Sequence, residues 1–230
     1  MSIEYNDIYK WSQQTNNKIN KNKEKQILFS NILNFKKLST NHTSNIFNYN
    51  IKPNIVSINQ KQTSRCWIFA SLNILRQYII RKYKLDNNYV LSVNYINFWS
   101  LLEKSNTYLN RINDTKNLPL NSRLYEAISK GISEGGNWHF ACSLITKYGV
   151  VPDYIMPNTL SANHSKLLLK IINKQLSYYV VEIRENNCDF NSMINHYLDN
   201  IYHILVLFLG TPILPSDNFK WEYEITKKRK

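Results

Sequence analysis

Cysteine is scarce in this sequence, with three in 230 residues. The three, Cys66, Cys142 and Cys188, lie far apart, and none belongs to a C-x-x-C pair. An odd number of isolated cysteines indicates neither a disulfide framework nor a zinc site, and it suits a reducing compartment. We therefore expect no metal site and no cofactor.

Long apolar runs are missing as well. The longest, ILVLFLG at 204–210, is far shorter than the roughly 20 residues that cross a bilayer. The first residues, MSIEYNDIYKWSQQ, contain no apolar stretch typical of a signal peptide. These absences predict a soluble, cytoplasmic chain without a membrane partner.

Acidic residues are few, 16 against 29 Lys and Arg, which gives a formal net charge of +13. Such an excess permits attraction to nucleic acid, to an anionic membrane surface or to an acidic partner. Lys, Asn and Ile are all abundant, however, which is the bias that an AT-rich genome imposes on any protein. No zinc-finger, helix-turn-helix or RNA-recognition signature accompanies the charge, so a nucleic-acid partner is only weakly supported.

The distribution of polar residues predicts three regions. Residues 1–45 are rich in Lys, Asn, Gln and Ser and form a polar N-terminal arm with one short apolar patch at 26–35. Residues 46–225 carry the periodic apolar patterns of a folded lobe. Residues 226–230, TKKRK, form a basic tail that is most simply a solvated chain end.

Periodic apolar residues predict a mainly helical lobe. An amphipathic stripe begins beside Cys66 and reaches about Lys84, so Cys66 lies in the first turn of a long helix that we expect to be central. Similar patterns predict helices over 91–112, 121–132, 137–149, 161–179 and 190–210. Strand signals are sparse, the best being VVEIR at 180–184 and NYNIK at 48–52.

Cys66 is a candidate nucleophile because of this position. A cysteine attacks as its thiolate, which the positive end of a helix N-terminus favours. Gln60, on the preceding loop, is a candidate donor that would stabilise an oxyanion beside the Cys66 amide. A lone cysteine at a helix start is otherwise a small buried hydrophobic residue, but the combination with Gln60 and Trp67 favours the catalytic interpretation.

Five sequence blocks together resemble the papain-type cysteine peptidases, in the branch of bleomycin hydrolase and bacterial aminopeptidase C. The blocks are NQKQTSRCW (59–67), LEKSNTYLNRI (102–112) with NSRL (121–124), EGGNW (134–138), KYGVVP (147–152), and LGTP with FKWEYE near the end. The resemblance implies an α+β papain-like fold, of which this chain carries the helical lobe with most of the β-rich lobe missing. Each block alone is weak, whereas their order and spacing are specific.

The resemblance also implies the roles of individual residues. Cys66 is the expected nucleophile and Gln60 the expected oxyanion donor. Gly135 and Gly136 match a glycine pair whose bare backbone pairs with an extended substrate, although a simple helix-breaking turn is the alternative. The expected substrate-binding residues are Gly135, Gly136, Asn137, Trp138 and Trp67.

One position departs from the family pattern. The family usually has glycine two residues before the cysteine, and here the residue is Ser64. A serine there would narrow the site or twist the loop, or it would cap the N-terminus of the following helix.

The catalytic base has no clear candidate. Papain-like catalysis needs a histidine about 130 to 150 residues after the cysteine, which points to His196 and His203. Both lie in a helical apolar pattern, and no Asn-Ser-Trp-Gly block follows them. His139 stands near the glycine pair but at a helix start, and His42 and His164 lie in polar segments. We therefore expect the base outside this polypeptide, in a second chain or another copy that supplies the missing lobe.

Two functions follow from these observations. The first is a cysteine peptidase that hydrolyses peptide or aminoacyl amide bonds, of which this chain supplies the nucleophile half and is inactive alone. The alternative is a non-catalytic remnant that binds peptides or a partner protein through the open cleft. Retention of Cys66 with Gln60 favours the first, and the missing histidine together with Ser64 favours the second.

Overall fold

The computed structural model describes residues 54–185, 190–214, 217 and 220–223. Several predictions lie outside these residues: the polar N-terminal arm with its apolar patch, the strand at 48–52 and the basic tail. Cys188 lies outside them as well. Within the described residues no β-strand is present, and one isolated antiparallel bridge joins Leu91 to Pro152. The prediction of a mainly helical lobe is confirmed.

The helices follow the predicted order closely. They are α3 (Cys66–Tyr83), α4 (Val93–Asp114), α5 (Arg123–Ser129), α6 (Trp138–Tyr148), α7 (Leu160–Asn163), α8 (Lys166–Glu185) and α9 (Phe190–Leu209). None of the helices in the described part of the chain combines the length and apolarity that crossing a membrane requires.

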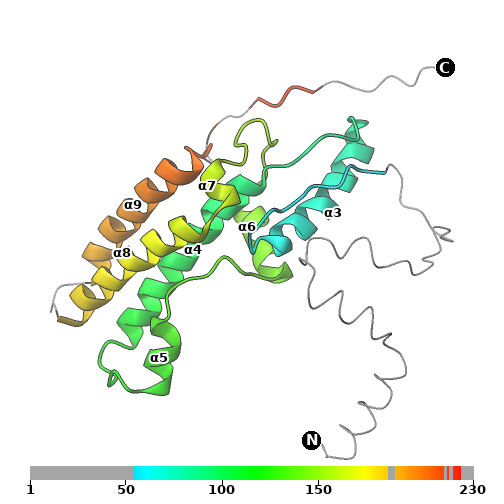
Figure 1. Ribbon diagram of the computed structural model, residues 1–230. Coiled ribbons are helices and arrows are strands. Elements are labelled where there is room, and N and C mark those ends of the chain that lie inside the picture. Colours follow the sequence, from blue (N-terminus) through cyan, green and yellow to red (C-terminus); the bar gives the residue numbers. More distant parts are fainter. Residues whose placement is uncertain (1–53, 186–189, 215–216, 218–219, 224–230) are drawn as a thin grey trace, which may run out of the picture. The chain divides into compact units, whose positions relative to one another are not determined.

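Helix α4 organises the packing. The Ser92 side chain caps it by accepting the Tyr95 N–H at 3.0 Å. Every residue from Val93 to Leu101 is buried, so this part of α4 is surrounded by other elements. It packs against α3 and α6 on one side and against α8 and α9 on the other (Figure 1). Helix α3, which we expected at the centre, packs against α4 and α6.

The strand predicted at 180–184 is wrong, because these residues form the last turns of α8. Val180 and Ile183 are buried while Val181 is half exposed, which is the three-residue spacing of a helix face and not the alternation of a strand. Burial of this face against α4 and α9 outweighs the β-propensity of the branched side chains.

The helix predicted over 161–179 is interrupted. α7 ends at Asn163 and α8 begins at Lys166. Between them, Ser165 is buried, and its hydroxyl donates to the Glu134 carboxylate at 2.9 Å. The break therefore brings a polar group to the site described next.

Candidate functional site

Cys66 is the first residue of α3 and is exposed, so the prediction that it lies in the first turn is confirmed. The residue that caps the helix is Arg65, without a side-chain hydrogen bond. The alternative in which Ser64 caps α3 is therefore wrong. The backbone N–H of Ser64 instead donates to Oε2 of Glu134 at 2.8 Å.

Glu134 joins the loop that precedes Cys66, residues 60–65, to the segment that carries the glycine pair, residues 133–137. These are called the cysteine loop and the glycine segment below. Its carboxylate is buried and accepts from the Ser64 N–H and from Ser165. Its backbone carbonyl accepts the indole N–H of Trp67 at 3.0 Å. Glu134 thus contacts the chain on both sides of Cys66, at Ser64 through its carboxylate and at Trp67 through its carbonyl. We did not select Glu134 from the sequence, although an acidic residue directly before a glycine pair in so basic a chain is a usable signal.

Arg65 lies behind the nucleophile as a fully buried cation. Its Nε is 3.7 Å from Oε1 of Glu134, and Nη1 donates to Oδ1 of Asn158 at 2.8 Å. Burial lowers the pKa of Arg65, and the negative charge of Glu134 opposes that shift. The side chain of the residue before Cys66 is therefore held by the charge of Glu134 and by the hydrogen bond to Asn158.

The two glycines of the pair have different surroundings. A Cβ on Gly136 would lie 2.5 Å from Cε2 of Trp67, whereas the nearest atom to a Cβ on Gly135 is Oγ of Ser133 at 4.0 Å. Close packing on the Trp67 ring thus requires glycine at Gly136 but not at Gly135. The backbone of both residues is exposed.

The other predicted substrate-binding residues divide into two groups. Asn137 caps α6 by accepting the Phe140 N–H at 2.9 Å, and Trp138 is 49% exposed at the start of that helix. Trp67 is 7% exposed and stacks on Phe140 with ring centroids 5.3 Å apart. Trp67 therefore packs against the buried side of the glycine segment, while Asn137 and Trp138 reach the surface.

Lys104 was not predicted from the sequence. Its ammonium donates to the Ser133 carbonyl at 2.8 Å and to the Gly135 carbonyl. It also lies 5.4 Å from the ring centroid of Trp67 and 5.5 Å from that of Phe140. Burial lowers the pKa of Lys104 to about 8, and Glu134 opposes the shift. A single α4 side chain therefore binds the carbonyls of the glycine segment.

Gln60 has a local partner. Its side-chain N–H donates to the Thr63 carbonyl at 3.0 Å, and the Thr63 hydroxyl donates to the Gln60 carbonyl at 2.8 Å. The amide carries two N–H groups, and one of them is thereby used within the loop. An oxyanion role would require the other.

The histidines that the structure describes are all exposed. His196 is hydrogen bonded to Asn200 and His203 to the Asp199 carbonyl, both on α9. In Figure 1, α9 lies on the side of α4 away from α3. His139 and His164 are exposed, and His42 lies outside the described residues. In the part of the chain that the structure covers, no imidazole is hydrogen bonded to the Cys66 thiol.

An apolar groove of about 430 Å³ lies between α3 and α6. Its exposed members include Ile74 and Tyr78 on α3 and Trp138 on α6. The groove borders the helix that carries Cys66 but does not include Cys66 itself. Its lining residues are Ser71, Ile74, Leu75, Tyr78, Trp138, Cys142, Ile145 and Thr146.

Comparison with known proteins gives consistent matches. The model of the peptidase C1-like family matches residues 2–230. Aminopeptidase C of Listeria monocytogenes is 35% identical over 195 residues, which are 80% of this chain and 44% of that protein. Bleomycin hydrolase of Oryctolagus cuniculus is 28% identical over 174 residues, 72% of this chain and 61% of that sequence.

A solved structure is similar as well. The crystal structure of PepW from Lactobacillus rhamnosis HN001 superposes with a TM-score of 0.71 and 29% sequence identity, covering 92% of this chain and 49% of that one. The matched part of the chain thus spans less than half the length of this structure and of the Listeria relative.

Proposed function

Because the chain belongs to the peptidase C1-like family, we propose that it acts as a cysteine peptidase on peptide or aminoacyl amide bonds, with Cys66 as nucleophile. The observation that carries the proposal is the exposed Cys66 at the first turn of α3, whose preceding loop is held against the glycine segment by Glu134. We expect this activity in the cytoplasm, where a reducing environment keeps Cys66 a free thiol.

The proposed reaction has two stages. The Cys66 thiolate attacks the substrate carbonyl, and the resulting tetrahedral oxyanion accepts hydrogen bonds from the Cys66 N–H and the Gln60 amide. The C–N bond then breaks, leaving a thioester on Cys66, and the amine departs with a proton from an imidazolium. Water activated by the same imidazole hydrolyses the thioester, which releases the acid and regenerates the thiol.

We propose that residues outside these 230 contribute the imidazole and the asparagine that orients it. Two observations support this. The described histidines are not bonded to Cys66, and His196 and His203 belong to α9 on the far side of α4. The apolar groove between α3 and α6 is a surface that a second lobe, in another chain or another copy, would cover.

A second candidate is a peptide-binding protein without catalysis. The position of Gln60 favours it, because its amide already donates within its own loop. This candidate predicts that peptides bind near the glycine segment and are never cleaved, whatever second chain is added.

Reconstitution tests the proposal. The purified chain alone should release no measurable amine from an aminoacyl amide, because general acid–base catalysis contributes roughly a hundred- to ten-thousand-fold. Adding a separately expressed second half that carries a histidine and an asparagine should produce turnover. Cys66→Ala should abolish that turnover, Gln60→Ala should reduce it, and Cys188→Ala is the matched thiol control that should retain it.

Two results would contradict this scheme. Turnover by the chain alone that disappears in His196→Ala or His203→Ala would place the base on α9. Turnover that survives Cys66→Ala would rule out this cysteine as the nucleophile.

A further inference from the structure

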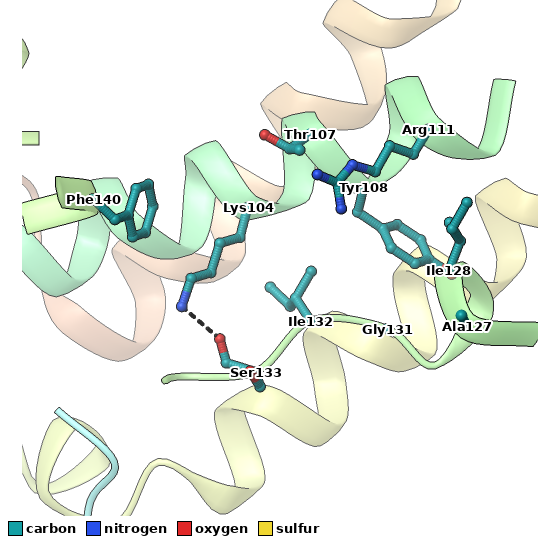
Figure 2. A pocket seen from close by; sticks show the side chains of 10 residues that line it. All are labelled: Lys104, Thr107, Tyr108, Arg111, Ala127, Ile128, Gly131, Ile132, Ser133 and Phe140. Atoms are coloured by element: carbon teal, nitrogen blue, oxygen red, sulfur yellow. Dashed lines mark hydrogen bonds between the residues drawn. The ribbon is translucent and has the colours of Figure 1, made fainter. Parts of the chain in front are cut away.

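A second pocket, of about 550 Å³, lies between α4, α5 and the segment that leads to the glycine pair (Figure 2). It does not include Cys66. It meets the candidate site at Lys104, Ser133 and Phe140, which border both. The full lining consists of Lys104, Thr107, Tyr108, Arg111, Ala127, Ile128, Gly131, Ile132, Ser133 and Phe140.

The charged residues that line this pocket, Lys104 and Arg111, are both cations. Lys104 and Arg111 lie seven residues apart, two turns along the same face of α4. No carboxylate belongs to the lining, whereas Thr107, Tyr108 and Ser133 add hydroxyl groups. Glu134 acts electrostatically on Lys104 from outside the lining. The two cations of the concave lining still produce a positive field that favours an anion.

The two cations have different partners. Lys104 is held by the carbonyls of Ser133 and Gly135. The Arg111 side chain is exposed and makes no hydrogen bond or ion pair within the described residues. Figure 2 shows its guanidinium above the pocket beside Thr107 and Tyr108. All the N–H donors of Arg111 are therefore available, in the planar arrangement that matches a carboxylate.

The rest of the pocket is apolar. Tyr108 is buried, and Ile128, Ile132 and Phe140 complete the walls. Burial raises the pKa of Tyr108 to about 12, with Tyr125 as the second cause, so its hydroxyl is neutral at physiological pH. The site thus suits a ligand that joins an anionic end to an apolar body.

We propose that this pocket binds a carboxylate-bearing residue of a peptide, with the carboxylate on Arg111 and the apolar part of the peptide against Tyr108 and Ile128. The peptide nature of the ligand rests on the proposed function, whereas the anion preference rests on the pocket alone. Lys104 connects the two sites, because it lines the pocket and also binds the Gly135 carbonyl. A peptide bound along the glycine segment would therefore place one of its own residues in the pocket.

Binding of capped dipeptides to the full chain tests this inference without any turnover. Acetyl-Phe-Glu-amide should bind roughly five- to tenfold more tightly than acetyl-Phe-Gln-amide in calorimetry, because one charge-assisted contact differs at a partly exposed site. Acetyl-Phe-Gln with a free C-terminal carboxylate separates the two sources of the anion, a side chain or a chain end. In ¹³C NMR of the Lys104 side chain, the acidic peptide should raise the Lys104 pKa above its value of about 8.

Matched variants identify the anion ligand. Arg111→Gln should remove the preference for the carboxylate peptides, and Arg111→Lys should restore part of it. Arg123→Gln is the control, because it removes one exposed positive charge from the neighbouring α5 without lining the pocket. Equal binding of the Glu and Gln peptides to the unmodified chain, or equal losses in Arg111→Gln and Arg123→Gln, would overturn the inference. A chain that keeps the preference but gives no turnover when the second half is supplied would contradict the proposed function alone.

Discussion

Gly136 lies against the face of Trp67 so closely that a single added methyl group would be 2.5 Å from the ring. Trp67 is buried and its N–H is bonded to the Glu134 carbonyl, so the ring has no free space into which to move. Stacking on Phe140 and the cation of Lys104 restrain it further. The glycine segment is therefore positioned by the residue that follows the nucleophile.

Gly136→Ala should lower the free energy of unfolding by roughly 1–3 kcal/mol, because the added methyl overpacks a fixed aromatic ring. Gly135→Ala is the matched control, since its Cβ would have no atom closer than 4.0 Å. It should change stability by less than about 1 kcal/mol. Urea unfolding of both variants measures the difference, and similar effects in the two would refute the packing argument.

Glu134→Gln should lower the free energy of unfolding by about 3 kcal/mol, because it removes the negative partner of the buried Arg65 while preserving side-chain volume. Glu126→Gln, at an exposed position of α5, should change it by less than about 0.5 kcal/mol. Both values come from chemical unfolding monitored by tryptophan fluorescence. If Glu134→Gln were as neutral as its control, the ion pair would not be what holds the loop before Cys66.

Cys66 should react with iodoacetamide faster than Cys142 or Cys188 under native conditions. Cys66 is exposed in the first turn of α3, where a reagent can reach it, whereas Cys142 is partly buried on α6. Brief labelling followed by peptide mass spectrometry gives the three rates. Cys66→Ser should eliminate the fast phase, and equal labelling of all three thiols would remove the case for an activated cysteine.

The Lys104 ammonium should make stability depend on pH in alkaline solution. Burial holds its pKa at about 8 in the folded chain, against an ordinary value of 10.5. Between these values the unfolded chain binds more protons, so the Lys104 contribution should stabilise the fold increasingly as pH rises from 8 to 10.5.

The difference in unfolding free energy between the unmodified chain and Lys104→Met, measured across this range, isolates that contribution. The subtraction matters because burial also raises the pKa of Tyr89 and Tyr108 to about 12, which acts in the opposite direction above pH 10. A difference that does not change with pH would show that Lys104 titrates normally.

Local patterns were sufficient for most of the helices. The apolar stripe after Cys66 predicted α3 to within a residue of its end, and Asn137 before Trp138 marks the start of α6. The sequence alone shows such signals because the side chains that interact lie three or four residues apart on one helix face. The same locality explains the failure at 180–184, where burial of Val180 and Ile183 against other helices overrode the strand propensity of the segment.

The candidate site was predictable only in part. The blocks around Cys66 and Gly136 could be recognised along the chain, because each consists of adjacent residues. The contact between the Ser64 N–H and Glu134 joins residues 70 positions apart, and the contact from Lys104 to Gly135 crosses 31. Contacts of this kind exist only once α4 has packed against α3 and α6, because helix packing and not chain order decides which charged side chains become buried together.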